Sequence, residues 1–165
     1  MMMKLLARAV SFVILASAVV LMSNCGGDDP KKSAQEIQLG KLSKTWILVS
    51  ASLNTVTEPP QQILSNFSLT FSGTFNANSP DGPYNFSVTG TQFPSPWPPS
   101  GTWRFAGIGS GDSGTLFRIT DDMPITYSID STGKLTLTFT CPAGGCEFPG
   151  ARTEQVVGVW TFVLE

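Results

Sequence analysis

The chain has no histidine, and only 13% of its 165 residues are charged. Without histidine, a Ser-His-Asp triad cannot form. With only three cysteines as well, a closed tetrahedral zinc site cannot be built from the usual ligands. The few Lys and Arg residues are scattered, so the basic patch that nucleic acid requires is missing too. We therefore expect no metal, no cofactor and no nucleic acid partner.

Long hydrophobic runs are also scarce. The longest, from Ala9 to Met22, is about fourteen residues, shorter than the roughly twenty that a membrane-spanning helix needs. It follows Lys4 and Arg8, an arrangement typical of an export signal. A permanent transmembrane anchor is the alternative. If the signal is removed, 8 of the 10 basic residues remain against 12 acidic ones, so the mature chain is acidic.

The end of this segment, Leu21-Met22-Ser23-Asn24-Cys25, resembles the lipobox of bacterial lipoproteins. The usual pattern has Leu three places before the cysteine and a small residue just before it, whereas this chain has Met22 and Asn24 there. Relaxed lipoboxes of this kind are similar to those of the Bacteroidota. The resemblance implies that Cys25 carries acyl chains such as palmitate and becomes the mature N-terminus. Asp28 and Asp29 resemble the acidic tract of lipoproteins on the outer face of the outer membrane.

Residues 25 to 165 are enough for one domain with a real core and too few for two. We expect a signal over 1–24, a flexible tether over 25–36 and a single domain over 37–165. Ser33 and Glu36 have the spacing of a capping box, which predicts a short helix from Ala34 to Lys41. That helix would present Ile37 and Leu42 to the core.

Cys141 and Cys146 remain once Cys25 carries lipid. An exported chain meets an oxidising compartment, where two such cysteines form a disulfide. Free thiols are the alternative, and a metal pair is disfavoured because no other usual ligands accompany it.

Beyond Ser43 the apolar residues alternate with Ser and Thr, which indicates strands with one buried face. In the first strand we expect Ile47, Val49, Ala51 and Leu53 on one face and Trp46 and Leu48 on the other. A short helix is predicted from Thr57 through Leu64. Eight strands are expected, around Trp46–Leu53, Phe67–Phe71, Tyr84–Thr89, Trp103–Phe105, Leu116–Ile119, Ile125–Ile129, Leu135–Phe139 and Val156–Leu164.

Eight short antiparallel strands indicate an all-β fold, either an up-and-down β-barrel or a β-sandwich. Lys44-Thr45-Trp46 and the segments around Trp103 and Trp160 resemble strands of lipocalin-like lipoproteins of the Bacteroidota, although Lys44 replaces the usual Gly. That resemblance implies a lipocalin-like barrel that binds a small hydrophobic ligand. An eight-stranded barrel holds either packed side chains or one small ligand.

Two patterns resemble catalytic motifs, but neither meets the requirements for catalysis. Gly109 to Gly114 matches G-x-G-x-x-G and contains Gly-Asp-Ser-Gly, but it precedes a strand instead of a helix and no histidine exists to activate Ser113. Asp121 and Asp122 are adjacent, so they are expected to be solvated turn formers and not a catalytic pair. We therefore expect no catalytic residues and no enzymatic activity.

Six residues are candidates for ligand binding. If the barrel is hollow, aromatic side chains from the strands would line it, and a buried arginine could hold a ligand carboxylate. Trp97 lies among four prolines in a loop, where it would either stack on a glycan from an exposed position or pack back onto the barrel. If the barrel is filled, the alternative function is a non-catalytic surface interaction or glycan binding through the Trp97 loop. The candidates are Trp46, Trp97, Trp103, Arg104, Tyr127 and Trp160.

The anchor can be tested directly in cells. Metabolic labelling with a tagged fatty acid should place lipid on the native chain and none on Cys25→Ser, because the thiol is the acceptor. Absence of label from both chains would contradict the predicted lipid attachment.

Overall fold

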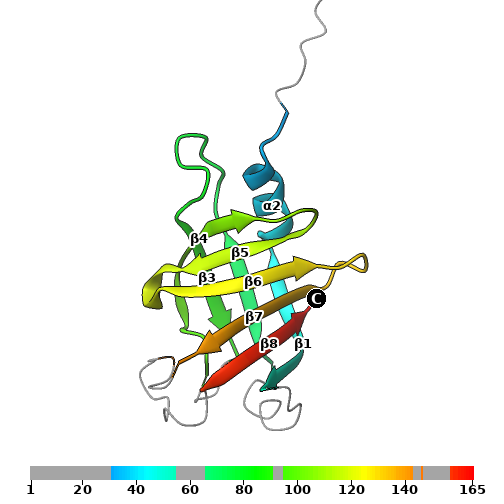
Figure 1. Cartoon of the computed structure of the whole chain (residues 1–165), viewed down its shortest axis with the longest axis vertical. Helices are drawn as coiled ribbons and strands as arrows, with labels where there is room; N and C mark the ends of the chain where they lie inside the picture. The colour runs from blue at the N-terminus through cyan, green and yellow to red at the C-terminus, as the bar shows by residue number, and fades with distance from the viewer. Residues whose placement is uncertain (1–30, 55–65, 91–94, 143–145, 147–156) are drawn as a thin grey trace, which may run out of the picture. The chain divides into compact units, whose positions relative to one another are not determined.

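The computed structural model describes residues 31–54, 66–90, 95–142, 146 and 157–165. These residues form one closed barrel of eight antiparallel strands, in which each strand pairs with the next and the last pairs with the first (Figure 1). The expected up-and-down barrel is confirmed, and the β-sandwich alternative is wrong. The strands are β1 (Thr45–Leu53), β2 (Ser68–Ser72), β3 (Tyr84–Thr89), β4 (Ser100–Ile108), β5 (Ser113–Arg118), β6 (Met123–Ile129), β7 (Leu135–Cys141) and β8 (Gly158–Leu164).

Alternation of buried apolar residues with outward-facing residues, most of them Ser or Thr, forms much of the barrel wall. In β3, Tyr84, Phe86 and Val88 are buried while the residues between them are exposed. In β6 and β7, too, every second residue is apolar and buried inside the barrel. Because side chains alternate across a strand, this pattern buries one face of the sheet, and closure of the sheet places that face inside the barrel. All eight expected strands are present, with ends that differ by a few residues.

The expected faces of the first strand are wrong. β1 has an irregularity in its pairing with β8 between Leu48 and Ser50, and such a bulge inserts one residue and reverses the alternation beyond it. As a result Ala51 is buried on the same side as Trp46, whereas Ile47 and Val49 are 58% and 44% exposed.

The helix α2 (Ala34–Leu42) covers one end of the barrel, which we call the helix end (Figure 1). The predicted cap is confirmed, since the Ser33 hydroxyl accepts a hydrogen bond from the Glu36 amide at 3.1 Å. Leu42 is buried as expected, but Ile37 is 44% exposed and Leu39 packs into the core instead.

Polar contacts fasten the same helix to the barrel. The Tyr127 hydroxyl donates to the Gln38 side-chain oxygen at 3.2 Å, and the Gln38 amide donates to the Gly111 carbonyl at 2.9 Å. Lys41 forms an ion pair with Asp112 in the β4–β5 turn. The glycine-rich segment 109–112 is therefore a turn between two strands that supports α2.

The predicted disulfide is confirmed between Cys141, at the end of β7, and Cys146, with Cα atoms 5.4 Å apart. Several other predictions concern residues outside the described part of the chain: the signal, Cys25, the tether as far as residue 30 and the helix from Thr57 to Leu64. A compact unit spans Ser33–Glu165, so residues 34–36 of the expected tether are helical. None of the helices described is long and apolar enough to span a membrane.

The two tyrosines should resist ionisation while the barrel is folded. Burial, and then the Asp112 carboxylate, raise the pKa of Tyr127 to about 12, and burial followed by Asp81 raises the pKa of Tyr84. Above pH 10 the unfolded chain loses phenolic protons that the folded chain retains, so the free energy of unfolding should fall from pH 10 towards pH 12. Ultraviolet titration of folded and guanidinium-unfolded protein checks this. Two tyrosines that titrate near pH 10 in the folded protein would contradict it.

Candidate functional site

The candidate site lies at the end of the barrel opposite α2, where the β3–β4 and β5–β6 connections meet; we call it the Trp97 end. Trp97 belongs to the β3–β4 connection and is only 2% exposed. Its ring centre lies 5.7 Å from that of Phe86 on β3 and 5.6 Å from that of Phe139 on β7. In a closed barrel of eight strands, β3 and β7 are four positions apart in either direction, so they form opposite walls. Trp97 therefore occupies the axis.

A short proline-rich segment inserts Trp97 into the barrel. Ser95, Pro96 and Pro98 are buried with it. Proline lacks a backbone N–H, so each buried proline brings one fewer donor that needs a partner. The Ser95 hydroxyl accepts a hydrogen bond from the Trp97 amide at 3.1 Å, which satisfies that donor. The sequence thus allows this segment to enter an apolar interior.

Arg118, the last residue of β5, lies fully buried beside Trp97. Its Nε and Nη2 atoms donate to the two carboxylate oxygens of Asp121 at 2.7 and 2.6 Å. Its Nη1 atom donates to the Pro96 carbonyl at 3.1 Å, and its guanidinium carbon lies 4.8 Å from the Trp97 ring centre. A planar guanidinium that both stacks on a ring and pairs with a carboxylate uses two preferences of arginine together. Arg118 therefore holds the Pro96–Trp97 segment in place.

The indole N–H of Trp97 is a buried donor with no hydrogen-bond partner in the described part of the chain. Two tryptophans on strands differ in this respect. Trp46 donates to the Leu42 carbonyl at 2.9 Å, and Trp103 donates to the Asn85 carbonyl at 3.1 Å. A buried donor without a partner costs about 1–3 kcal/mol. The position of Trp97 inside the barrel is thus less favourable than that of an otherwise similar core tryptophan.

Of the six expected ligand-binding residues, Arg104 lies outside the barrel and the other five lie inside it. Arg104 is exposed on the outer wall, with its guanidinium carbon 4.6 Å from the Phe117 ring centre, so it is not a buried arginine. An exposed Trp97 is also wrong, because that ring lies inside the barrel. The strand aromatics are 0–3% exposed and pack on neighbouring rings or polar groups; they are Trp46, Trp103, Tyr127 and Trp160.

Sequence reasoning missed Arg118 and Asp121. The position of Arg118 was readable, because it lies two residues after Leu116 and so shares its inward face. The role of Asp121 was not readable. It lies in the short 3₁₀ helix η1 (Ile119–Asp121), and the left-handed conformation of Asp122 after it completes the turn towards β6. Among the described residues Arg118 is the only buried charged side chain.

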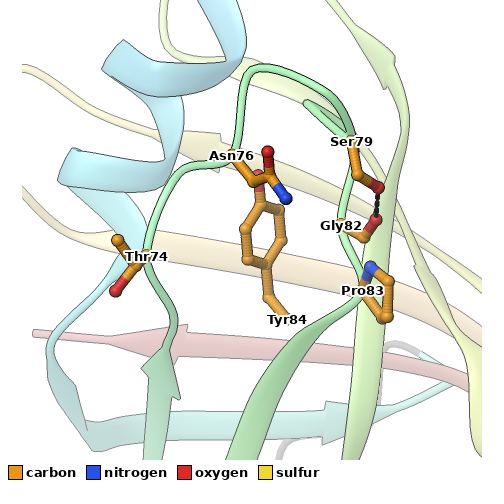
Figure 2. A pocket seen from close by; sticks show the side chains of 6 residues that line it. All are labelled: Thr74, Asn76, Ser79, Gly82, Pro83 and Tyr84. Atoms are coloured by element: carbon orange, nitrogen blue, oxygen red, sulfur yellow. Dashed lines mark hydrogen bonds between the residues drawn. The ribbon is translucent and has the colours of Figure 1, made fainter.

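A hollow lies at the helix end, in the β2–β3 connection (Figure 2). It measures about 190 Å³ and is lined by Thr74, Asn76, Ser79, Gly82, Pro83 and Tyr84. Its polar groups are largely engaged within the loop. The Ser79 hydroxyl bonds to the Gly82 carbonyl, Asn76 accepts from the Asn78 amide, and the Tyr84 hydroxyl donates to the Pro80 carbonyl at 2.7 Å. These contacts shape the loop and leave the Trp97 end as the better candidate.

Comparison with known proteins assigns the chain to no family and gives no indication of its function. No protein-family model, curated protein or solved structure matches the chain significantly. Across the described ranges, no three His, Cys, Asp or Glu residues cluster in a way that could hold a metal ion. The contacts of Trp97 and Arg118 are therefore the features of the described residues that bear most directly on function.

The ion pair at the Trp97 end can be tested with two adjacent aspartates. Asp121→Asn should lower the free energy of unfolding by about 2–4 kcal/mol, because a fully buried guanidinium loses a charged partner; the cost is moderated because the Asp121 side chain is 21% exposed. Asp122→Asn is the matched control and should change stability by less than about 0.5 kcal/mol, since Asp122 is exposed and Asn tolerates its left-handed conformation. Urea denaturation measures both; equal effects would contradict the role of Asp121.

Proposed function

We propose that this protein is a non-enzymatic, lipid-anchored barrel that binds a small apolar ligand at the place now filled by Trp97. In this proposal Trp97 and the ligand compete for the axis of the barrel. The Pro96–Trp97 segment leaves when the ligand enters. Cys25 would hold the domain on the outer membrane, as the lipobox-like segment predicts.

The observation that carries the proposal is that, at the Trp97 end, the axis is occupied by a loop residue and not by a strand residue. Strand side chains cannot leave the barrel without breaking its hydrogen-bonded wall. Trp97 is held by side-chain contacts and by the bond between Arg118 and the Pro96 carbonyl. Withdrawal of the loop would leave a space of indole size between Phe86, Phe139 and Phe162.

The free energy that keeps Trp97 buried is comparable to the free energy that a bound ligand can supply. A tryptophan buries about 150–250 Å², which at about 25 cal/mol per Å² stabilises its buried position by roughly 4–6 kcal/mol. The indole N–H without a partner subtracts about 1–3 kcal/mol from that figure. A ligand with a ring of similar size recovers the same contacts with Phe86 and Phe139. A ligand of ordinary affinity can therefore displace Trp97 from the barrel.

The outer wall supports a second candidate function, recognition of an uncharged surface or partner. Across the eight strands the only charged side chains are Arg104 and Arg118, and of these only Arg104 is exposed. Ser and Thr make up most of the outward positions, with exposed Ile47, Val49 and Val159 among them. In this alternative Trp97 stays in the core permanently.

Fluorine NMR of protein labelled with 5-fluorotryptophan separates the two candidates. The chain has 4 tryptophans, and Trp97→Phe identifies the Trp97 resonance. Addition of 3-ethylindole should move the Trp97 resonance to a solvent-exposed position and leave the other three in place. Trp97→Ala should bind the same probe at least about tenfold more tightly, because no indole has to be displaced.

Trp103→Phe is the control for general loosening of the core, because Trp103 is a strand residue with a paired N–H. In this variant the Trp97 resonance should still respond to the probe. If Trp97→Ala binds 3-ethylindole while the Trp97 resonance of the native protein does not move at saturating probe, Trp97 is a permanent core residue and ligand exchange is refuted.

A further inference from the structure

We infer that the ligand is an uncharged aromatic molecule that carries a carbonyl acceptor a few bonds from its ring, and that Arg118 and Asp121 together reject aromatic carboxylates. This inference rests on the proposed function and names the chemical class of its ligand.

The Pro96–Trp97 segment shows what the site accepts, because it occupies the site as a ligand would. It offers the barrel a flat ring and one neutral oxygen. Arg118 contacts both, with its guanidinium carbon 4.8 Å from the ring centre and its Nη1 atom 3.1 Å from the Pro96 oxygen. That oxygen is joined to the ring through four atoms: the Pro96 carbonyl carbon and the nitrogen, Cα and Cβ of Trp97. A ligand with the same ring-to-oxygen spacing reproduces both contacts.

The charge on the acceptor decides the class of ligand. Asp121 already neutralises Arg118 through two hydrogen bonds of 2.7 and 2.6 Å. A ligand carboxylate at the Pro96 oxygen position would put a second negative charge on one guanidinium in a buried site. Like charges close together in a low-dielectric interior repel strongly, and burying an excess charge carries a desolvation cost. A neutral carbonyl takes the hydrogen bond without either cost.

A ligand with no acceptor fits less well for a different reason. When the Pro96–Trp97 segment leaves, the Nη1 atom of Arg118 loses its carbonyl partner. Loss of a hydrogen bond to a charged group is more costly than loss of a neutral one. The site therefore selects a ring with a neutral acceptor over a bare ring as well as over an acid.

Three probes with related chains test the inference on the native protein. N-acetyltryptamine reproduces the Trp97 side chain and the Pro96 carbonyl, indole-3-butyrate places a carboxylate at the same number of bonds, and 3-ethylindole has no acceptor. Displacement of the fluorinated Trp97 resonance reports binding. N-acetyltryptamine should bind most tightly, at least about tenfold more tightly than indole-3-butyrate.

Asp121→Asn should reverse this preference, because the site then carries one negative charge fewer beside the guanidinium, and a ligand carboxylate can supply it in place of Asp121. Indole-3-butyrate should then bind more tightly than N-acetyltryptamine and also raise the melting temperature of the variant. Asp122→Asn should keep the native order. If Asp121→Asn folds poorly, the relative affinities of the three probes for the native protein are sufficient to test the inference.

The outcomes separate the two proposals. If all three probes displace Trp97 with equal affinity, or if indole-3-butyrate binds the native protein best, ligand binding stands and the proposed ligand class is wrong. If none of the probes moves the Trp97 resonance, the proposed function fails and the ligand class fails with it.

Discussion

At the Trp97 end, the indole of Trp97 occupies the axis of the barrel, and the packing there depends on it. An eight-stranded barrel is just wide enough for its interior to be filled by side chains. Here Phe86 and Phe139 approach from opposite walls and meet the same ring at 5.7 and 5.6 Å. Because that ring comes from a connection and not from a strand, the core of the fold and the candidate ligand site are the same place.

A buried charge ties the two connections at this end together. Arg118 is the last residue of β5, and its carboxylate partner Asp121 is the last residue of η1, just before β6. The Nη1 atom of Arg118 reaches the Pro96 carbonyl in the β3–β4 connection. A guanidinium in an apolar interior requires a partner for its charge. The β5–β6 turn therefore has to keep its conformation for the Trp97 segment to stay in the barrel.

Much of the fold was predictable from local patterns. Alternation identified all eight strands, the spacing of Ser33 and Glu36 identified α2, and Cys141 and Cys146 form the expected disulfide. The candidate site was less predictable. Alternation correctly turned Arg104 outward, but nothing local to the proline-rich loop indicated that Trp97 would lie on the axis. The faces of β1 were wrong because a bulge depends on pairing with β8, which lies more than a hundred residues away.

The order of the residues alone was thus enough for the strand pattern, the cap of α2, the cysteine pair and the expectation of a lipid on Cys25, because each depends on neighbours in the chain. Closure of the barrel, the bulge in β1 and the meeting of Trp97, Arg118 and Asp121 depend on contacts between segments far apart in sequence. The local sequence around a tryptophan among prolines does not determine where its ring packs. In this protein the position is determined by opposite walls of the barrel, which leave a space of indole size between them. The carboxylate that neutralises Arg118 likewise gains its role only when burial removes water from the guanidinium.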